Sequence, residues 1–475
     1  MKNYHVCFVL LIATMFSCQQ KVEWISTTEQ QSWNREEALN FSGWNIETPD
    51  VQINPDDTLQ NIDGFGACFN ELGWTSLSEL SENDRLAIMK ELFEPGTGAN
   101  FTICRMPIGA NDFSLDWYSY DETEGDFEMK NFSIQNDFKT LVPFIHLAQK
   151  YNPGLQIWAS PWSPPSWMKW NKHYACAIPW EGLREEFQNH LPADKQGKEG
   201  TNMFIQEDAY FKAYANYFGK FIEAYDQQGI RISMVMPQNE FNSCQIFPSC
   251  TWTAAGLATF IGEYLGPELE AHKVQIMFGT MERPAEALVD TILNDPEAGR
   301  YIKGVGFQWA GKEAITGIHQ RYPKLKLYQS EQECGDGKND WKYCNYAWTL
   351  MKHYLSNGSS AYMYWNISLN QDGFSRWGWQ QNSLVTVDSF THTFKFNHEY
   401  YLMKHISHFV KPGAKRLETN GGYNDLLAFL NADRSIAIIV RNPLDEVKQV
   451  TIQINSKAIN PVLKASSFNT FLVQL

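Results

Sequence analysis

The stretch ISMVMPQNE, residues 232–240, decides the fold, because an apolar run with the character of a β-strand ends there at a glutamate. A second such run, LKLYQSE at residues 325–331, also ends at a glutamate. Short apolar runs bounded by polar residues are typical of buried strands. In a parallel barrel the carboxyl ends of all strands meet at one mouth, so this arrangement would bring Glu240 and Glu331 together.

Six further apolar runs make eight in total, and amphipathic stretches of helical period lie between them. Eight strands alternating with helices indicate an α/β fold, the (β/α)8 TIM barrel, which we assign to residues 61–410. The expected strands are residues 64–69, 101–108, 155–160, 232–238, 274–280, 304–309, 325–330 and 361–366. The expected helices include residues 82–93, 136–150, 209–228, 254–265, 341–356 and 399–409.

The pattern changes after the barrel. Residues 411–475 contain short strands separated by turn signals, which predicts an all-β module. Residues 45–60 also look extended, so we expect a β-sandwich built from both termini. Residues 19–44 are polar without sustained periodicity and are predicted to form a tether. Residues 171–207 form a long polar insertion after the third strand, where loops of a barrel commonly shape a site.

The first 18 residues have the features of a signal peptide. Lys2 precedes an apolar run at residues 6–16 that is too short to span a bilayer. Cys18 follows a small residue, as in the bacterial lipoprotein box, so we expect lipid attachment there; ordinary signal cleavage is the alternative. Gln19 after the cysteine resembles lipoproteins sorted to the Gram-negative outer membrane. The chain is therefore expected to be exported and to meet a membrane only through this anchor.

Charge and cysteine content restrict the remaining functions. The net charge of −15, without any basic run, argues against binding to nucleic acid. The nine cysteines include no CxxC pair, and no phosphate loop is evident, so neither a metal nor a cofactor is expected. Cys244 and Cys250 lie close together in a loop and could form a disulfide or stay free.

Two carboxylates at one barrel mouth are the minimal equipment for hydrolysis of a glycosidic bond. In a retaining enzyme one carboxyl protonates the leaving oxygen while the other, about 5 Å away, attacks the anomeric carbon. The acid needs a raised pKa, which burial and a neighbouring carboxylate provide. The 17 tryptophans fit this chemistry, because aromatic faces stack on sugar rings. Glu333 is a rival nucleophile, since strand alternation would direct it to the same side as Glu331.

Six ordered blocks of the chain resemble glycoside hydrolase family 30, the family of glucosylceramidase and bacterial β-1,6-glucanases. The resemblance runs from about residue 61 to the C-terminus. Its blocks are DGFGA (63–67), RMPIG with NDFS (105–114), ASPWSPPSWMK (159–169), PQNE (237–240), SE (330–331) and YWNISLN (364–370).

The resemblance implies roles for individual residues. Glu240 matches the acid/base of the family and Glu331 matches the nucleophile. Asn239 matches the residue that hydrogen-bonds the 2-hydroxyl of the sugar. These roles imply double displacement, with a glycosyl-enzyme intermediate on Glu331.

Four further residues match positions that bind the sugar at the non-reducing end. Asp112 would accept hydrogen bonds from hydroxyl groups, while Trp162 and Trp365 would form apolar walls. Asn382 matches a further asparagine of the pocket. Packing in the barrel core is the alternative role for the two tryptophans.

The chain departs from the family pattern at two places. Gln308-Trp309 stands where the glucosylceramidase branch has His-Trp, so the side chain beside the nucleophile cannot carry a proton or charge. The insertion at residues 171–207 is the second departure. Because of it, the family pattern does not predict what binds on the aglycone side.

Together these features predict a retaining β-glycoside hydrolase that acts on β-glucosides or β-1,6-linked glucan. The same mechanism on a β-fucoside, β-xyloside or β-galactoside is an alternative. An alternative of a different class is a non-catalytic surface lipoprotein that binds glycans.

Overall fold

The computed structural model describes residues 21–42 and 48–474. The expected signal peptide, including Cys18, lies outside the described residues, as do residues 45–47. Within the described ranges, no helix is both long and apolar enough to cross a membrane.

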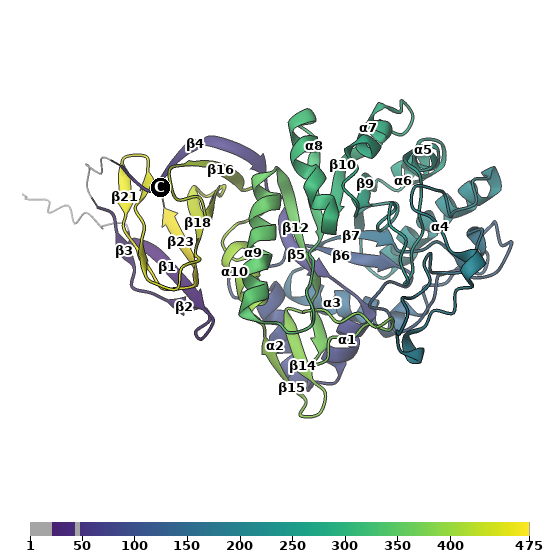
Figure 1. The fold of residues 1–475 in the computed structure, drawn as a ribbon, viewed down its shortest axis with the longest axis horizontal. Helices are drawn as coiled ribbons and strands as arrows, with labels where there is room; N and C mark the ends of the chain where they lie inside the picture. The colour runs from purple at the N-terminus through teal and green to yellow at the C-terminus, as the bar shows by residue number, and fades with distance from the viewer. Residues whose placement is uncertain (1–20, 43–47, 475) are drawn as a thin grey trace, which may run out of the picture.

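The expected α/β barrel is confirmed as a closed ring of eight parallel strands (Figure 1). The strands are almost wholly buried, as is usual where helices cover a parallel barrel. They are β5 (Gly64–Cys68), β6 (Ile103–Ile108), β7 (Gln156–Pro161), β8 (Ile232–Val235), β9 (Gln275–Met281), β10 (Ile302–Gln308), β11 (Lys326–Glu331) and β12 (Ser359–Asn366). Strand β12 pairs with β5 and completes the ring.

Helices surround the barrel, and several begin at side chains that cap them. The Ser81 hydroxyl accepts a hydrogen bond from Asp84 N, and Asp340 accepts one from Tyr343 N. The helices are α1 (Glu71–Ser78), α2 (Glu82–Phe93), α3 (Leu141–Tyr151), α4 (Asp208–Gln227), α5 (Ala254–Thr259), α6 (Gly266–Ala271), α7 (Glu286–Asn294), α8 (Ile315–Arg321), α9 (Trp341–Ser356) and α10 (His398–Ser407). A π-helical stretch, Phe260–Leu265, joins α5 to α6.

Close strand packing explains one glycine of the GFG motif in β5. A Cβ atom at Gly66 would lie 1.8 Å from the carbonyl oxygen of Ile103 in β6. Any side chain there would force these two strands of the barrel apart.

The β-sandwich is built from both ends of the chain, as expected. Its large sheet has the order β2-β1-β23-β18-β17-β16-β4-β20-β21, and β3 pairs with β1. Its strands are β1 (Lys21–Thr28), β2 (Asn34–Arg35), β3 (Leu39–Asn40), β4 (Val51–Asn61), β16 (Lys415–Asn420), β17 (Leu426–Leu430), β18 (Ser435–Asn442), β20 (Ile452–Ile454), β21 (Lys457–Ile459) and β23 (Ser467–Gln474). A short pair, β19 (Lys448–Gln449) and β22 (Val462–Leu463), accompanies it.

The prediction of a tether over residues 19–44 is wrong for the part of this segment that forms a strand. Residues 21–28 form β1, which pairs antiparallel with β23 over six residues. Val22 and Ile25 are buried, and the Trp24 indole donates to Asn469 Oδ1 at 3.0 Å. The segment is therefore part of the folded β domain.

The two faces of this sheet belong to different cores. Leu426 and Ala428 pack in the sandwich core, whereas Leu427 and Phe429 join the large core of the barrel. This division follows from the alternation of side chains along β17. Helices α9 and α10 lie between the β domain and the barrel (Figure 1).

The insertion at residues 171–207 contains only single helical turns but is pinned to its surroundings. The Asn189 side-chain amide donates to Ala177 O and Ile246 O, both at 2.8 Å. Arg376 donates to Glu186 O at 2.7 Å, which ties the insertion to the loop at residues 371–384. That loop leads from β13 (Ser368–Asn370) to the hairpin of β14 (Val385–Asp388) and β15 (Thr393–Phe396).

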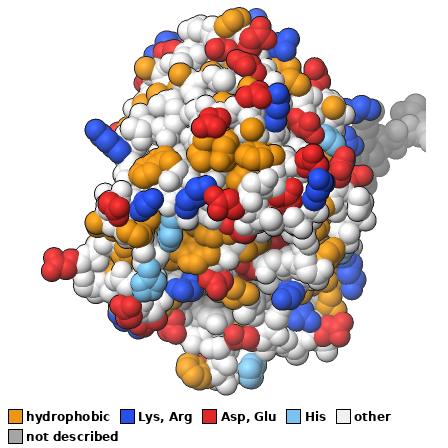
Figure 2. Space-filling model, turned by 90° about the vertical axis from the view of Figure 1, so that its right-hand side faces the viewer, with side chains coloured by type: hydrophobic (Ala, Val, Ile, Leu, Met, Phe, Trp, Pro, Cys, Tyr) orange, Lys and Arg blue, Asp and Glu red, His pale blue; other side chains and the backbone are white. Residues whose placement is uncertain are grey.

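Charged side chains of both signs are scattered over the face shown in Figure 2, while hydrophobic side chains gather near its centre. This face carries no continuous basic region.

Candidate active site

Glu240 and Glu331 meet at the carboxyl-terminal mouth of the barrel. Glu331 is the last residue of β11, and Glu240 lies five residues beyond β8. Each is 4% exposed and lines a cavity of about 190 Å³. That volume is below the roughly 300–1,000 Å³ of pockets that enclose drug-sized ligands, so the cavity would hold a smaller ligand. Its walls comprise four carboxylates, Asp112, Glu240, Glu282 and Glu331, four aromatic rings, Trp162, Phe247, Trp309 and Trp379, and two amides, Gln245 and Gln381.

Two wall residues have unusual backbone conformations. Glu240 and Trp309 both have a φ of 48°, in the left-handed region that L-residues rarely adopt. Conformations of this kind cost of order 1–3 kcal/mol and persist where the surrounding structure holds them, commonly at functional sites.

The side-chain amide of Gln308 joins the two glutamates. Gln308 Nε2 lies 3.1 Å from Glu240 Oε1 and 3.2 Å from Glu331 Oε2. Gln308 Oε1 accepts a hydrogen bond from Ser330 Oγ at 2.9 Å, which orients the amide. A neutral donor thus stands where a histidine would bring a titratable group.

Glu331 is surrounded by hydrogen-bond donors. Arg105 Nη1 lies 2.8 Å from Glu331 Oε2, and Trp309 Nε1 lies 3.1 Å from Oε1. Burial leaves the pKa of Glu331 above its ordinary value, although the Arg105 guanidinium and the hydrogen bonds from Trp309 and Gln308 act in the opposite direction. These donors favour the ionised carboxylate.

Glu240 has a contrasting environment. Burial raises its pKa well above the ordinary value, and the negative charges of Glu331 and Glu282 raise it further. Its Oε2 accepts one hydrogen bond from Gln245 Nε2 at 2.9 Å. Of the two carboxyls, Glu240 therefore favours its protonated form more strongly.

Arg105 organises the floor of the site from inside β6. It is fully buried, and its Nη2 donates to Ser160 Oγ at 2.8 Å and to Asn239 Oδ1 at 2.7 Å. Its guanidinium lies 4.3 Å from the ring centroid of Trp162. Sequence reasoning did not single out this residue, although a lone arginine inside an apolar strand signals a buried partner.

Asn239 lies beside the two glutamates, and hydrogen bonds to its side-chain oxygen hold it in place. Its Oδ1 accepts hydrogen bonds from Arg105, Gln308 and Thr280. Its Nδ2 has no hydrogen-bond partner within residues 21–42 and 48–474. The amide nitrogen is thus free to donate to a ligand.

Asp112 supplies an acceptor in the cavity wall. It is 4% exposed, and its Oδ1 has no hydrogen-bond partner among the described residues. Burial raises its pKa well above the ordinary value, and the charge of Glu331 adds to this. A buried oxygen without a partner is costly unless a ligand hydroxyl satisfies it.

The two predicted tryptophans have different positions. Trp162 lines the cavity, whereas Trp365 is fully buried, does not line it, and stacks on Trp162 with ring centroids 5.3 Å apart. Trp309 forms another wall, next to Glu331.

Several wall residues were not expected from the sequence. Glu282 immediately follows β9, and this position was the available signal. Its pKa is raised by burial, although Arg283 beside it acts in the opposite direction. Phe247 and Trp379 meet edge to face with centroids 6.2 Å apart, and they come from long loops that carry no strand-end signal.

Two sequence predictions require correction. Asn382 is buried, does not line the cavity, and donates instead to Glu399 at 3.2 Å, while its neighbour Gln381 forms the wall. Glu333 forms an ion pair with Lys312 at 2.7 Å and accepts from Tyr346 at 2.8 Å. It is directed away from the cavity because β11 ends at Glu331, where the strand alternation stops.

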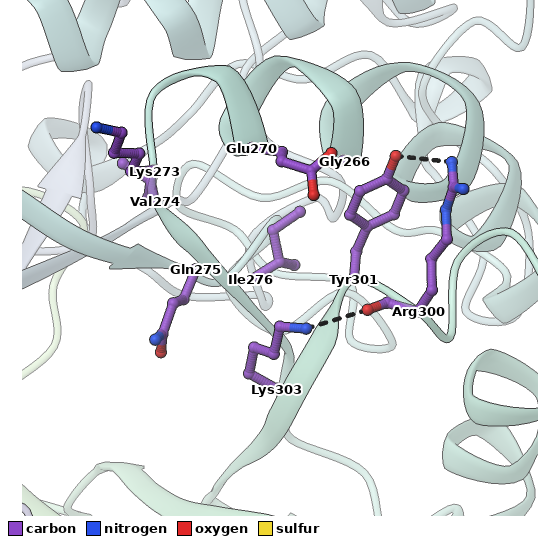
Figure 3. A pocket seen from close by; sticks show the side chains of 9 residues that line it. All are labelled: Gly266, Glu270, Lys273, Val274, Gln275, Ile276, Arg300, Tyr301 and Lys303. Carbon is purple, nitrogen blue, oxygen red and sulfur yellow. Dashed lines mark hydrogen bonds between the residues drawn. The ribbon is translucent and has the colours of Figure 1, made fainter.

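A second cavity, of about 440 Å³, lies at the opposite end of the barrel (Figure 3). Its residues include Gln275 and Lys303, at the amino ends of β9 and β10. Arg300 donates to the Tyr301 hydroxyl, and Lys303 donates to Arg300 O. Both hydrogen bonds join residues of the cavity to one another.

Cys244 and Cys250, one possible disulfide, are both free thiols in the structure. Cys250 is buried, whereas Cys244 is partly exposed and hydrogen-bonds to the thiol of Cys176.

Comparison with known proteins gives consistent matches over the whole described fold. The model for the glycosyl hydrolase family 30 TIM-barrel domain matches residues 62–410, and the model for the family 30 β-sandwich domain matches residues 413–471. The lysosomal acid glucosylceramidase of Mus musculus is 26% identical over 431 residues, which are 85% of this chain and 79% of that protein. The endo-1,6-β-D-glucanase neg1 of Aspergillus fumigatus is 28% identical over 435 residues, which are 85% and 84% of the two chains. The solved structure of the endo-β1,6-glucanase BT3312 superposes with a TM-score of 0.80 at 26% identity, covering 96% of this chain and all of that one.

Proposed function

The chain belongs to glycoside hydrolase family 30 and is a β-glycoside hydrolase, and we propose that it works by double displacement with Glu331 as nucleophile and Glu240 as acid/base. The observation that carries this proposal is the single amide of Gln308 that donates to both carboxyls.

That shared donor limits the distance between the two glutamates. The oxygens that it contacts cannot be farther apart than its two hydrogen bonds placed end to end. A retaining enzyme requires two carboxyl groups that lie about 5–5.5 Å apart. The shared donor favours such a close pair.

The electrostatics support the assignment of roles. Arg105, Trp309 and Gln308 stabilise the carboxylate of Glu331, as a nucleophile requires. Burial and three neighbouring carboxylates favour the protonated form of Glu240, as a general acid requires.

The reaction then has two steps. In the first, a carboxylate oxygen of Glu331 bonds to the anomeric carbon, the glycosidic bond breaks, and Glu240 gives its proton to the leaving oxygen. In the second, Glu240 takes a proton from water as the water oxygen attacks the anomeric carbon. This releases the sugar with its original β configuration and restores both glutamates.

Other wall residues would hold the sugar. Asp112 Oδ1 would accept from a hydroxyl group, and Asn239 Nδ2 would donate to the 2-hydroxyl, a contact that strengthens in the transition state. Trp162 would provide an apolar face for the ring.

We propose a β-glucosyl substrate, either β-1,6-linked glucan or a smaller β-glucoside. Two similar proteins are named as endo-1,6-β-glucanases, and another as a glucosylceramidase. Beyond the cavity wall Trp379 lies 5.5 Å from Trp180 of the insertion, which is 46% exposed. These paired rings offer a platform for a further sugar unit, which favours a glucan.

We also propose that residues 1–18 direct export and that Cys18 is lipidated, placing the enzyme on the outer membrane. Strand β1 begins at Lys21, so at most about 10 Å of extended chain separates the attachment point from the β domain. Labelling with a radioactive fatty acid tests this. Wild type should be labelled and Cys18→Ala should not, and label on the variant would overturn the assignment.

The catalytic proposal is tested by trapping the intermediate. An aryl 2-deoxy-2-fluoro-β-glucoside has a good leaving group, and its fluorine slows release of the glycosyl-enzyme. Tryptic peptide 327–338 contains both Glu331 and Glu333, and fragmentation should place the sugar on Glu331. Label on Glu333, or none with an active enzyme, would overturn the assignment.

Matched variants separate hydrolysis from simple glycan binding. Glu331→Gln should lower kcat by at least about 10³-fold on aryl β-glucosides, while Glu333→Gln stays near wild type. A binding protein would show no turnover in any of the three forms. Products from β-1,6-glucan and from aryl β-fucosides, β-xylosides and β-galactosides would then identify the sugar and distinguish endo from exo action.

A further inference from the structure

The insertion at residues 171–207 meets the loop after Glu240 at two cysteines. The backbone amides of Cys176 and Ala177 both donate to Gln245 O, at 3.0 and 2.9 Å. Cys244 precedes Gln245, and its thiol is hydrogen-bonded to the thiol of Cys176. Two thiols that interact, on backbone segments already hydrogen-bonded to each other, meet the first requirement for a disulfide, which is that the two side chains lie side by side.

The surroundings of Cys176 favour its thiolate. Cys176 is fully buried, and the ammonium of Lys169 is held nearby by Tyr174 O and Ser249 O, each at 2.6 Å. Burial raises the pKa of Cys176, but the hydrogen bond from Cys244 and the charge of Lys169 lower it to a net value of about 6. Cys244 is partly exposed and can be reached from solvent.

We propose that Cys176 and Cys244 form a disulfide that ties the insertion to the loop carrying Gln245. The oxidant is an external disulfide, supplied by a thiol–disulfide exchange protein or a small molecule such as oxidised glutathione. Formation of this bond does not require the hydrolytic reaction proposed above.

The chemistry is a two-step exchange. Cys244, which is partly exposed, loses its proton to solvent and attacks the external disulfide, forming a mixed disulfide and releasing one external thiolate. The Cys176 thiolate then attacks Cys244 Sγ, which forms the internal bond and releases the second thiolate. Two protein thiols are oxidised and one external disulfide is reduced to two thiols.

This bond would act on the active site through Gln245. Gln245 adjoins Cys244 and donates to Glu240 Oε2 at 2.9 Å. A covalent link at the preceding residue restricts the loop and keeps that donor beside the acid/base.

Peptide mapping of the full chain distinguishes this bond from the rival pairing of Cys244 with Cys250. The reduced protein is incubated with oxidised glutathione, alkylated and digested with trypsin. Cys176 lies in peptide 173–184, and both Cys244 and Cys250 lie in peptide 232–273. We expect these two peptides to be joined. A bond within 232–273, with alkylated Cys176, would overturn the proposal, as would three alkylated thiols after oxidation.

Matched variants give a second readout. Oxidation should lower the thiol count of denatured wild type by two, and Cys250→Ser should lose two thiols as well. Cys176→Ser and Cys244→Ser should show no joined peptide, and their melting temperatures should not respond to the oxidant, whereas that of wild type rises. A joined peptide in Cys176→Ser would contradict the assignment. The peptide mapping of the wild-type protein uses no variant, so its result remains valid even if a variant fails to fold.

Discussion

Arg105 and Glu331 form a buried ion pair, with Arg105 Nη1 2.8 Å from Glu331 Oε2 and both side chains no more than 4% exposed. Lysine at position 105 would keep the charge but lose the planar fork that also contacts Ser160 and Asn239. Arg105→Lys should lower kcat by at least about 10²-fold. The pKa of Glu331 should rise, so the acidic limb of the kcat/KM profile moves to higher pH.

Arg441→Lys is the matched control, since Arg441 pairs with Asp425 in the β domain at 2.8 Å. It should leave both kcat and the pH profile unchanged. An unaltered profile for Arg105→Lys would argue against a role for Arg105 in holding the nucleophile.

Glu282 should tune the acid/base through its charge. It is among the carboxylates that raise the pKa of Glu240. Glu282→Gln removes this charge, so Glu240 should lose its proton at lower pH, and the basic limb of kcat/KM should shift downward. Glu333→Gln, which is directed away from the cavity, should leave this limb in place. An upward shift for Glu282→Gln would contradict the assigned direction.

The paired rings of Trp379 and Trp180 should affect the binding of polymeric substrates only. Trp180→Ala should raise KM for β-1,6-glucan several-fold, in line with about 0.5–1.5 kcal/mol for an aromatic contact, and leave aryl glucosides unaffected. Trp170, similarly exposed at 41% but outside the cavity wall, provides the control variant Trp170→Ala. Equal effects on both substrates would exclude a platform for a further sugar.

Strand β1 should contribute to the free energy of unfolding, whereas a tether would not. Trp24 is 9% exposed in the sandwich core, so Trp24→Ala should lower the free energy of unfolding by about 3–5 kcal/mol. Urea denaturation followed by circular dichroism measures this change. Trp170→Ala again serves as an exposed comparison. An unchanged midpoint for Trp24→Ala would mean that β1 is dispensable.

Asp137 should make stability depend on pH. It is buried, accepts from the hydroxyls of Tyr118, Tyr120 and Tyr225, and burial raises its pKa to about 7. The folded state therefore binds a proton that the unfolded state releases above about pH 4. Stability from this group is complete below pH 4 and is lost as the pH rises to about 7, by roughly 4 kcal/mol.

Asp137→Asn stays neutral and should lack this loss. The urea midpoint of wild type, relative to the variant, should fall between pH 5 and pH 7.5. A midpoint difference that is constant or grows with pH would show that Asp137 is ionised in the folded protein.

The barrel was predictable because its strands are buried on both sides and so appear as continuous apolar runs. The same runs located Glu331, which ends one of them, and Glu240, which follows another. Glu282 was missed because one acidic residue after β9 has no distinguishing neighbour. Glu333 was misplaced because it follows the end of β11, where a period of two no longer describes the chain. Asn382 was assigned by resemblance alone, and it lies in the loop between β13 and β14.

Strand β1 could not be predicted for a different reason. KVEWISTT is short, and its pairing depends on β23, with Trp24 and Asn469 separated by 445 positions. Local pattern carries no information about a partner at that distance.

That separation also sets an order of folding during synthesis. Strands β1 and β4 leave the ribosome first, but β16, β17, β18 and β23 are made last. The barrel segment can collapse while the N-terminal strands still have unpaired edges, which are open to wrong pairing with other chains. The β domain is therefore complete only when the final residues have been made. A chain that ends before β23 lacks the strand that pairs with β1.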